Sequence, residues 1–144
     1  MGERIAPGLR SLLRERKIIR SRISRGMVLK ELEASKNDLG AARKSRDEED
    51  YKWATVQAHY SIFHAAKALL YSKGFREKSH RGLLAALRQL YPREIPGSML
   101  DDFREAMELR ESADYGLVWS DESATNVLDT AEAFLHKVKS ILRH

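Results

Sequence analysis

Apolar residues recur along most of this chain at the three- and four-residue spacing of an α-helix, most clearly over residues 51–73. One side of this stretch carries small and aliphatic residues: Ala58, Ile62, Ala65 and Leu69. The other side carries a narrow stripe of polar and aromatic residues: Tyr60, His64, Lys67 and Tyr71. A helix with two such sides either docks in a polar interface or helps to build a site. Both alternatives stay open from the pattern alone.

Further helices are predicted on either side of this one. Residues 28–44 and the stretches that open at Ser79, Ser98 and Ser120 show apolar residues at helical spacing, and serine is a preferred N-cap residue. No strand-like alternation bounded by turn residues is evident. The sequence therefore predicts an all-α fold, an antiparallel bundle of four to five helices over residues 27–144.

Residues 1–26 are predicted to form a basic N-terminal arm or helix ahead of this bundle. The first 30 residues contain nine lysines and arginines but only two glutamates. Apolar residues in the arm follow a helical stripe as far as Ile23, and Gly26 is the expected break: Leu9, Leu12, Leu13, Ile19 and Ile23. A basic arm can bind nucleic acid because phosphate contacts release counterions. The alternative is a solvated helix face.

Composition narrows the classes of protein that remain. The 144 residues suit one domain, and the absence of cysteine excludes a disulfide framework or a thiolate zinc site. No apolar run is long enough to span a membrane, and the charged N-terminus does not resemble a signal peptide, so a cytoplasmic protein is expected. His59 and His64 lie about 140° apart around their helix and cannot share one metal ion from the same face. Neither a metal nor a cofactor is expected.

A second basic cluster follows the long helix. Gly74 suits the left-handed residue that commonly ends a helix, and the next helix begins near Ser79. Five basic residues surround this junction: Lys73, Arg76, Lys78, His80 and Arg81. Basic side chains beside a helix N-terminus are typical of a phosphate- or nucleotide-binding loop, although a solvated loop has the same composition.

Four segments, in this order, resemble the HEPN (higher eukaryotes and prokaryotes nucleotide-binding) domain family: AHYSIFHAAKALLYSKG, KSHRGL, ELRESADYG and AEAFLHKVKSIL. The resemblance covers about residues 28–142 and is closest to the small stand-alone prokaryotic branch. It implies a helical bundle that forms a homodimer through its central helices. Tyr60, Lys67 and Tyr71 would then line the dimer interface.

The resemblance also implies an activity. Many HEPN proteins are metal-independent ribonucleases, often toxins paired with a nucleotidyltransferase antitoxin, and they use an Arg followed four to six residues later by a His. This chain has Arg110, but Asp114 and Tyr115 stand where that His is expected. If the protein is catalytic, Arg110 would stabilise the phosphate, and Asp114, Tyr115 or His64 would transfer protons.

Two other functions remain open. The first is a non-catalytic dimeric interaction module that docks a nucleotidyltransferase or another partner, in which Arg110 and Asp114 form a structural ion pair. The second is a nucleotide-binding domain that uses the basic loop around Ser79. The expected partners are therefore a second copy of the chain, a nucleotidyltransferase, and RNA or a nucleotide.

Overall fold

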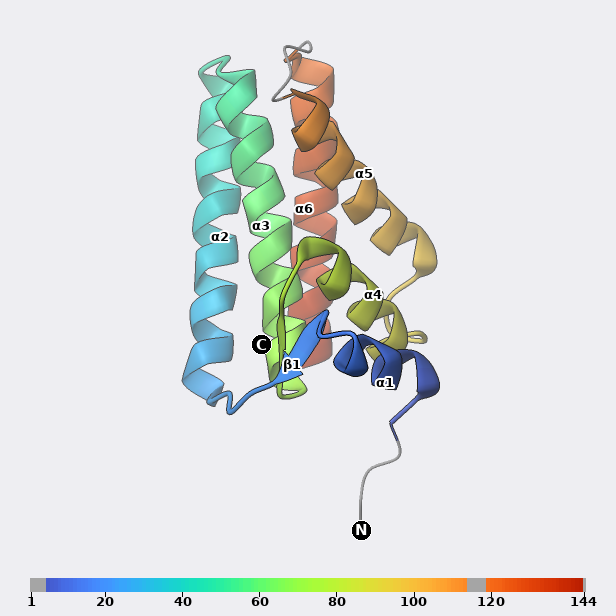
Figure 1. The fold of residues 1–144 in the computed structure, drawn as a ribbon. Coiled ribbons are helices and arrows are strands. Elements are labelled where there is room, and N and C mark those ends of the chain that lie inside the picture. The colour runs from blue at the N-terminus through green and yellow to red at the C-terminus, as the bar shows by residue number, and fades with distance from the viewer. Residues whose placement is uncertain (1–4, 114–118, 144) are drawn as a thin grey trace.

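The computed structural model describes residues 5–113 and 119–143, with the backbone alone over 109–113. These residues form six helices and two short strands (Figure 1): α1 (Pro7–Arg14), β1 (Ile18–Arg20), α2 (Arg25–Asp47), α3 (Tyr51–Ser72), β2 (Phe75–Glu77), α4 (His80–Leu90), α5 (Gly97–Ala113) and α6 (Asp121–Leu142). The predicted all-α bundle is confirmed. None of the described helices is long and apolar enough to cross a lipid bilayer.

The helix α3 lies at the centre of the bundle, between α2 on one side and α6 and α5 on the other (Figure 1). It is buried along most of its length, and alanines with no exposed surface let its neighbours approach closely: Ala54, Ala58, Ala65, Ala66 and Ala68. Large side chains from the surrounding helices fill the remaining space, among them Phe103 of α5 and Phe134 of α6, whose ring centroids lie 5.8 Å apart.

Two buried serines fix how α2 lies against α3. The Ser35 hydroxyl donates to the Ser61 carbonyl oxygen at 2.7 Å, and the Ser61 hydroxyl donates to the Ser35 carbonyl oxygen at 2.9 Å. Both residues are fully buried. Because a buried hydroxyl without a partner costs free energy, this reciprocal pair favours one register of the two helices over its neighbours.

Several helix ends agree with the sequence pattern, but α2 is longer than the predicted 28–44 and includes Gly26, the expected break, because Ser24 caps it one residue before Arg25. Ser79 and Ser120 are confirmed as N-caps, since their hydroxyls accept the backbone N–H groups of the third residue along. Gly74 adopts the predicted left-handed conformation, with φ of 83°. The helix α5 begins at Gly97, one residue earlier than Ser98, because the Pro96 carbonyl already accepts the first helical hydrogen bonds.

The N-terminal segment differs from the predicted helical stripe. The helix α1 ends at Arg14, and Ile18–Arg20 forms β1, which pairs antiparallel with β2 so that Ile18 faces Glu77 and Arg20 faces Phe75. Two consecutive β-branched isoleucines favour an extended strand at this point. Ile18 is fully buried, so the segment is packed onto the bundle.

The start of α4 is held against this segment by a close backbone contact. The Lys78 N–H donates to the Lys17 carbonyl oxygen at 2.9 Å. A Cβ atom on Gly82 would lie only 2.5 Å from the same oxygen and 3.0 Å from the Ser79 hydroxyl that caps α4. Glycine at this position therefore allows the N-terminal segment to dock on the first turn of α4.

We predict that Gly82→Ala destabilises the protein, because the added methyl group forces the Lys17 carbonyl away from α4. The expected loss is about 1–3 kcal/mol, the usual cost of overpacking, measured by urea unfolding followed by circular dichroism. Gly40→Ala is the matched control. Gly40 lies inside α2 with nothing within 4 Å of an added Cβ, so alanine there should stabilise by up to about 1 kcal/mol. Equal effects of the two substitutions would contradict the docking.

Candidate functional site

The polar stripe of α3 is paired with acidic residues of α2 and β2. His64 approaches Glu31 at 2.6 Å through Nδ1 and Asp38 at 3.6 Å through Nε2. Lys67 Nζ lies 3.2 Å from the other Glu31 oxygen and 3.9 Å from Glu77. Glu31 therefore joins two residues of the stripe, and Lys67 connects the long helices to the small sheet.

The charges in this network reinforce one another. Burial raises the pKa of Glu31, but the hydrogen bond from His64 and the charges of Lys67 and His64 outweigh burial and leave that pKa below its ordinary value. Burial lowers the pKa of Lys67, but Glu31 and Glu77 outweigh it and leave that pKa above its ordinary value. For Asp38, burial raises the pKa and the His64 charge only partly opposes it. The ionised Glu31–Lys67 pair thus stabilises the packing of α2 on α3.

Most side chains of the polar stripe therefore have their contacts within the same chain. Tyr71 is only 5% exposed and Lys67 lies over its ring, whereas Tyr60 remains 37% exposed. His64 turns toward α2, and in the described part of the chain α2 makes no contact with α5, the helix that carries Arg110. Within one protomer His64 does not face α5.

A surface cleft of about 230 Å³ lies between α4 and α5. Three arginines and a histidine contribute to its walls together with one glutamate and three apolar residues: His80, Arg81, Leu84, Ala85, Arg88, Arg104, Met107 and Glu108. Asp101 accepts a hydrogen bond from Arg88 at 2.8 Å and lies 3.9 Å from Arg104. Among the described residues Arg81 has no ion-pair partner. The cleft is cationic overall and suits an anionic ligand.

Aromatic contacts from α3 hold His80 at the edge of this cleft. The His80 ring is exposed, and its centroid lies 4.3 Å from that of Phe63 and 5.9 Å from that of His59. His59 is almost fully buried beneath it. An exposed imidazole on a fixed aromatic support can form hydrogen bonds with a molecule bound in the cleft. No cluster of three or more metal-ligating side chains occurs among the residues that the structure describes.

The five basic residues predicted to bind phosphate do not form one cradle. His80 and Arg81 lie together in the cleft. By contrast, Lys73 Nζ lies 5.5 Å from the Tyr91 ring, and the Arg76 guanidinium lies 5.1 Å from the Tyr71 ring. These two cations stack on aromatic faces of α3 and the end of α4, away from the cleft lining.

The three candidates near the end of α5 are only partly covered by the structure. Arg110 lies within α5, one helical turn beyond Met107 of the cleft, but its side chain is outside the described residues. Asp114 and Tyr115 also lie outside the described residues. Their catalytic roles stay predictions.

Two of the cleft arginines come from neither basic cluster and were not predicted from the sequence. Arg88 and Arg104 are ordinary charged residues on amphipathic helices, and nothing in the pattern indicates that α4 and α5 bring them together. One signal was available, because Arg81 and Arg88 are seven residues apart and share one face of a helix. Phe63 and His59 were also missed as the support of His80.

We predict that Glu31→Gln destabilises the protein at pH 7 by about 1–3 kcal/mol, since it removes a charged, half-buried hydrogen-bond acceptor. The folded state holds the pKa of Glu31 below its unfolded value, so this stabilisation is present above about pH 4.5 and disappears as the pH falls through the folded-state pKa. Urea unfolding of both proteins from pH 7 to pH 3 should show the gap closing. Glu33→Gln, an exposed neighbour on α2, is the control and should change little. A gap that stays constant with pH would contradict the network.

Known proteins resemble this chain over most of the bundle. A family model described as HEPN domain matches residues 29–141, from the first turns of α2 to the end of α6. A Methanocaldococcus jannaschii protein named "Putative toxin MJ0605" is 30% identical over 118 residues, which cover 78% of this chain and 86% of that protein. A second protein of the same organism, "Putative toxin MJ0142", is 29% identical over 115 residues, covering 77% and 78% of the two chains.

A third relative comes from Archaeoglobus fulgidus and is named "UPF0332 protein". It is 37% identical over 95 residues, which cover 62% of this chain and 74% of that protein. The matched family region contains the whole of α3, α4 and α5, and thus both the polar stripe and the cationic cleft. On the helical bundle and on these matches, the chain belongs to the HEPN domain family.

Proposed function

We propose that this HEPN-family protein is a toxin-like, metal-independent endoribonuclease. The observation that carries the proposal is the arginine-rich cleft between α4 and α5, with an exposed histidine at its edge and Arg110 one turn further along α5. Such a cleft can hold the phosphates of an RNA strand through charge-assisted hydrogen bonds. The names of two relatives, "Putative toxin MJ0605" and "Putative toxin MJ0142", support the same function.

In the proposed reaction the RNA 2′-hydroxyl attacks the adjacent phosphorus and displaces the 5′ oxygen of the next nucleotide. Arg110 stabilises the charge that develops on the phosphate oxygens. Asp114 suits the base and Tyr115 suits the acid, because aspartate in general has a pKa near 4 and tyrosine a pKa near 10. His64 is the alternative proton carrier, supplied by a second protomer.

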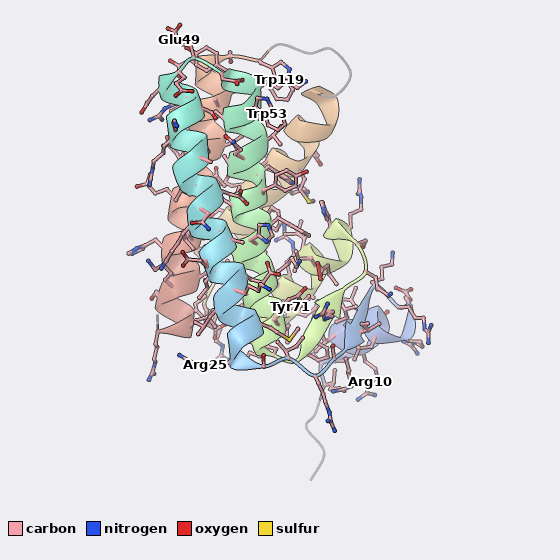
Figure 2. All side chains as sticks on the ribbon, turned by 90° about the vertical axis from the view of Figure 1, so that its left-hand side faces the viewer. Arg10, Arg25, Glu49, Trp53, Tyr71 and Trp119 are labelled. Atoms are coloured by element: carbon pink, nitrogen blue, oxygen red, sulfur yellow. The ribbon has the colours of Figure 1, made fainter. Side chains whose placement is uncertain are left out.

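Exposed aromatic residues on α3 support a homodimer. Trp53 is 54% exposed and Tyr60 is 37% exposed, and the seven-residue spacing places both on one face of α3. Figure 2 shows Trp53 near the turn between α2 and α3, with Tyr71 toward the opposite end of the same helix. We propose that a second copy of the chain covers this aromatic face.

The same face favours a second candidate function, a non-catalytic dimeric module that docks a nucleotidyltransferase antitoxin. Asp114 and Tyr115 in place of a histidine are compatible with such a module. In either case a nucleotidyltransferase is the proposed partner, and a gene for one beside the gene for this chain would support the pairing.

We predict that Arg110→Ala lowers the rate of RNA cleavage by about 10²–10³-fold, the usual effect of removing one group that stabilises a developing negative charge. Cleavage of a fluorescent RNA by the purified protein in EDTA is the measurement, with growth arrest on induced expression as the cellular readout. Arg43→Ala is the control, because Arg43 is exposed on α2 and pairs with Glu132 of α6. Wild-type protein that cuts no RNA would favour the interaction module. Undiminished cleavage by Arg110→Ala would refute the assigned role of Arg110.

For the dimer, the double variant Trp53→Ala/Tyr60→Ala is expected to dissociate into folded monomers. Interface hot spots are enriched in Trp and Tyr and cost about 2 kcal/mol or more when truncated, so the dissociation constant should rise by at least about 30-fold. Light scattering after gel filtration, across a dilution series, measures it. Lys52→Ala, an exposed neighbour of Trp53, should leave the dimer intact. A monomeric wild type, or a double variant that dimerises normally, would rule out this face.

A further inference from the structure

The N-terminal segment lies outside the matched family region, yet it is built into the fold. The family model begins at residue 29, whereas α1 and β1 occupy residues 7–20. Leu9 is 6% exposed and Ile18 is fully buried. The helix α1 packs along α4, where a Cβ atom on Gly8 would collide with the Gln89 side chain. Figure 1 shows α1 beside α4 at the lower end of the molecule.

This docking joins two basic clusters that are about 60 residues apart in the sequence. The Lys17 carbonyl accepts the Lys78 N–H and contacts the turn at Gly82, which places residues 16 and 17 against residues 78–82. The docking thus brings together the backbone of four residues with exposed cationic side chains, which we call the basic band: Arg16, Lys17, Lys78 and Arg81. A single docked segment thus doubles the positive charge at the start of α4.

Few carboxylates oppose this charge. In the described part of the chain none of the four cations of the basic band forms an ion pair. Glu77, the acidic residue before Lys78, is paired with Lys67 of α3, and Glu15 is exposed at the end of α1. Holding like charges together without partners costs electrostatic free energy that an anionic partner would recover.

The basic band runs into the cleft between α4 and α5. Arg81 belongs to both, and Arg88, seven residues further on, lies on the same outer face of α4 and also lines the cleft. Gly82 and Gln89, each one residue further around the helix, face the N-terminal segment. The cationic residues therefore extend across α4, from the side that faces the N-terminal segment to the side that lines the cleft.

We propose that the basic band binds the backbone of a single-stranded RNA and leads that strand into the α4–α5 cleft. This proposal rests on the proposed function for the identity of the nucleic acid. An extended row of cations suits a polyanion better than one isolated phosphate. A lipid surface fits less well, because insertion needs an exposed apolar helix face, whereas Leu9, Leu12 and Leu13 of α1 pack against the core.

The test is the salt dependence of binding to a fluorescent 2′-O-methyl RNA, which cannot be cleaved. Because each phosphate contact on a single strand contributes about −0.7 to the slope of log K against log salt, Lys17→Gln/Lys78→Gln should reduce the magnitude of the slope by about 1.4. Its affinity near 0.1 M salt should fall on the order of tenfold.

The matched control is Lys44→Gln/Lys52→Gln, which removes the same charge from exposed positions beside the turn between α2 and α3. Figure 2 shows that turn, marked by Glu49, at the opposite end of the molecule from Arg10 and Arg25. The control should keep the wild-type slope. Circular dichroism and urea unfolding establish that both variants remain folded.

The outcomes of this experiment distinguish failure of the RNA track from failure of the proposed nuclease function. An unchanged slope in Lys17→Gln/Lys78→Gln overturns the basic band as an RNA track, even if the protein cleaves RNA through Arg110. A reduced slope supports the track, even if the protein cuts no RNA and the nuclease is refuted. A slope lost equally in both double variants shows only nonspecific attraction and overturns the track. Binding to phosphatidylserine vesicles that depends on Lys17 and Lys78, without a change in RNA binding, also overturns it.

Discussion

The packing of α2 against α3 determines where the rest of the molecule can lie. The reciprocal bonds of Ser35 and Ser61 set the register of the two helices, and Glu31 then receives both His64 and Lys67 from the polar stripe of α3. Phe63 and His59 lie on another face of α3, where their rings contact His80 at the start of α4. These contacts place His80 at the edge of the cationic cleft.

The position of α4 depends in turn on the N-terminal segment. The strand pair of β1 and β2 and the contact of the Lys17 carbonyl with Gly82 fix the first turn of α4, the turn that presents His80 and Arg81 to the cleft. A segment outside the matched family region thus helps to position residues inside it. Docking of the N-terminal segment on α4 therefore also brings the residues of the basic band together.

Much of the bundle could be predicted from the sequence because long helices have a strong periodic signal and serine and glycine mark their ends, as at Ser79 and Gly74. The strand at Ile18–Arg20 could not be predicted, because three residues are too few to show a periodic pattern. In addition, the apolar residues from Leu9 to Ile23 recur at helical spacing and so favoured a helix. The site was less predictable still. Lys73 and Arg76 are adjacent to His80 in sequence, yet they stack on Tyr91 and Tyr71. Arg104 reaches the cleft only through the packing of α5 on α4.

The proposed nuclease and the proposed RNA track both require RNA to bind in the cleft between α4 and α5. Photo-crosslinking of the protein to an RNA that contains 4-thiouridine, followed by mass spectrometry of the peptides, tests whether it does. We expect crosslinks on the peptides of α4 and α5 that contain His80, Arg81 and Arg104. Crosslinks confined to the outer surfaces of α2 and α6, or none above the level seen with free uridine competitor, would contradict it.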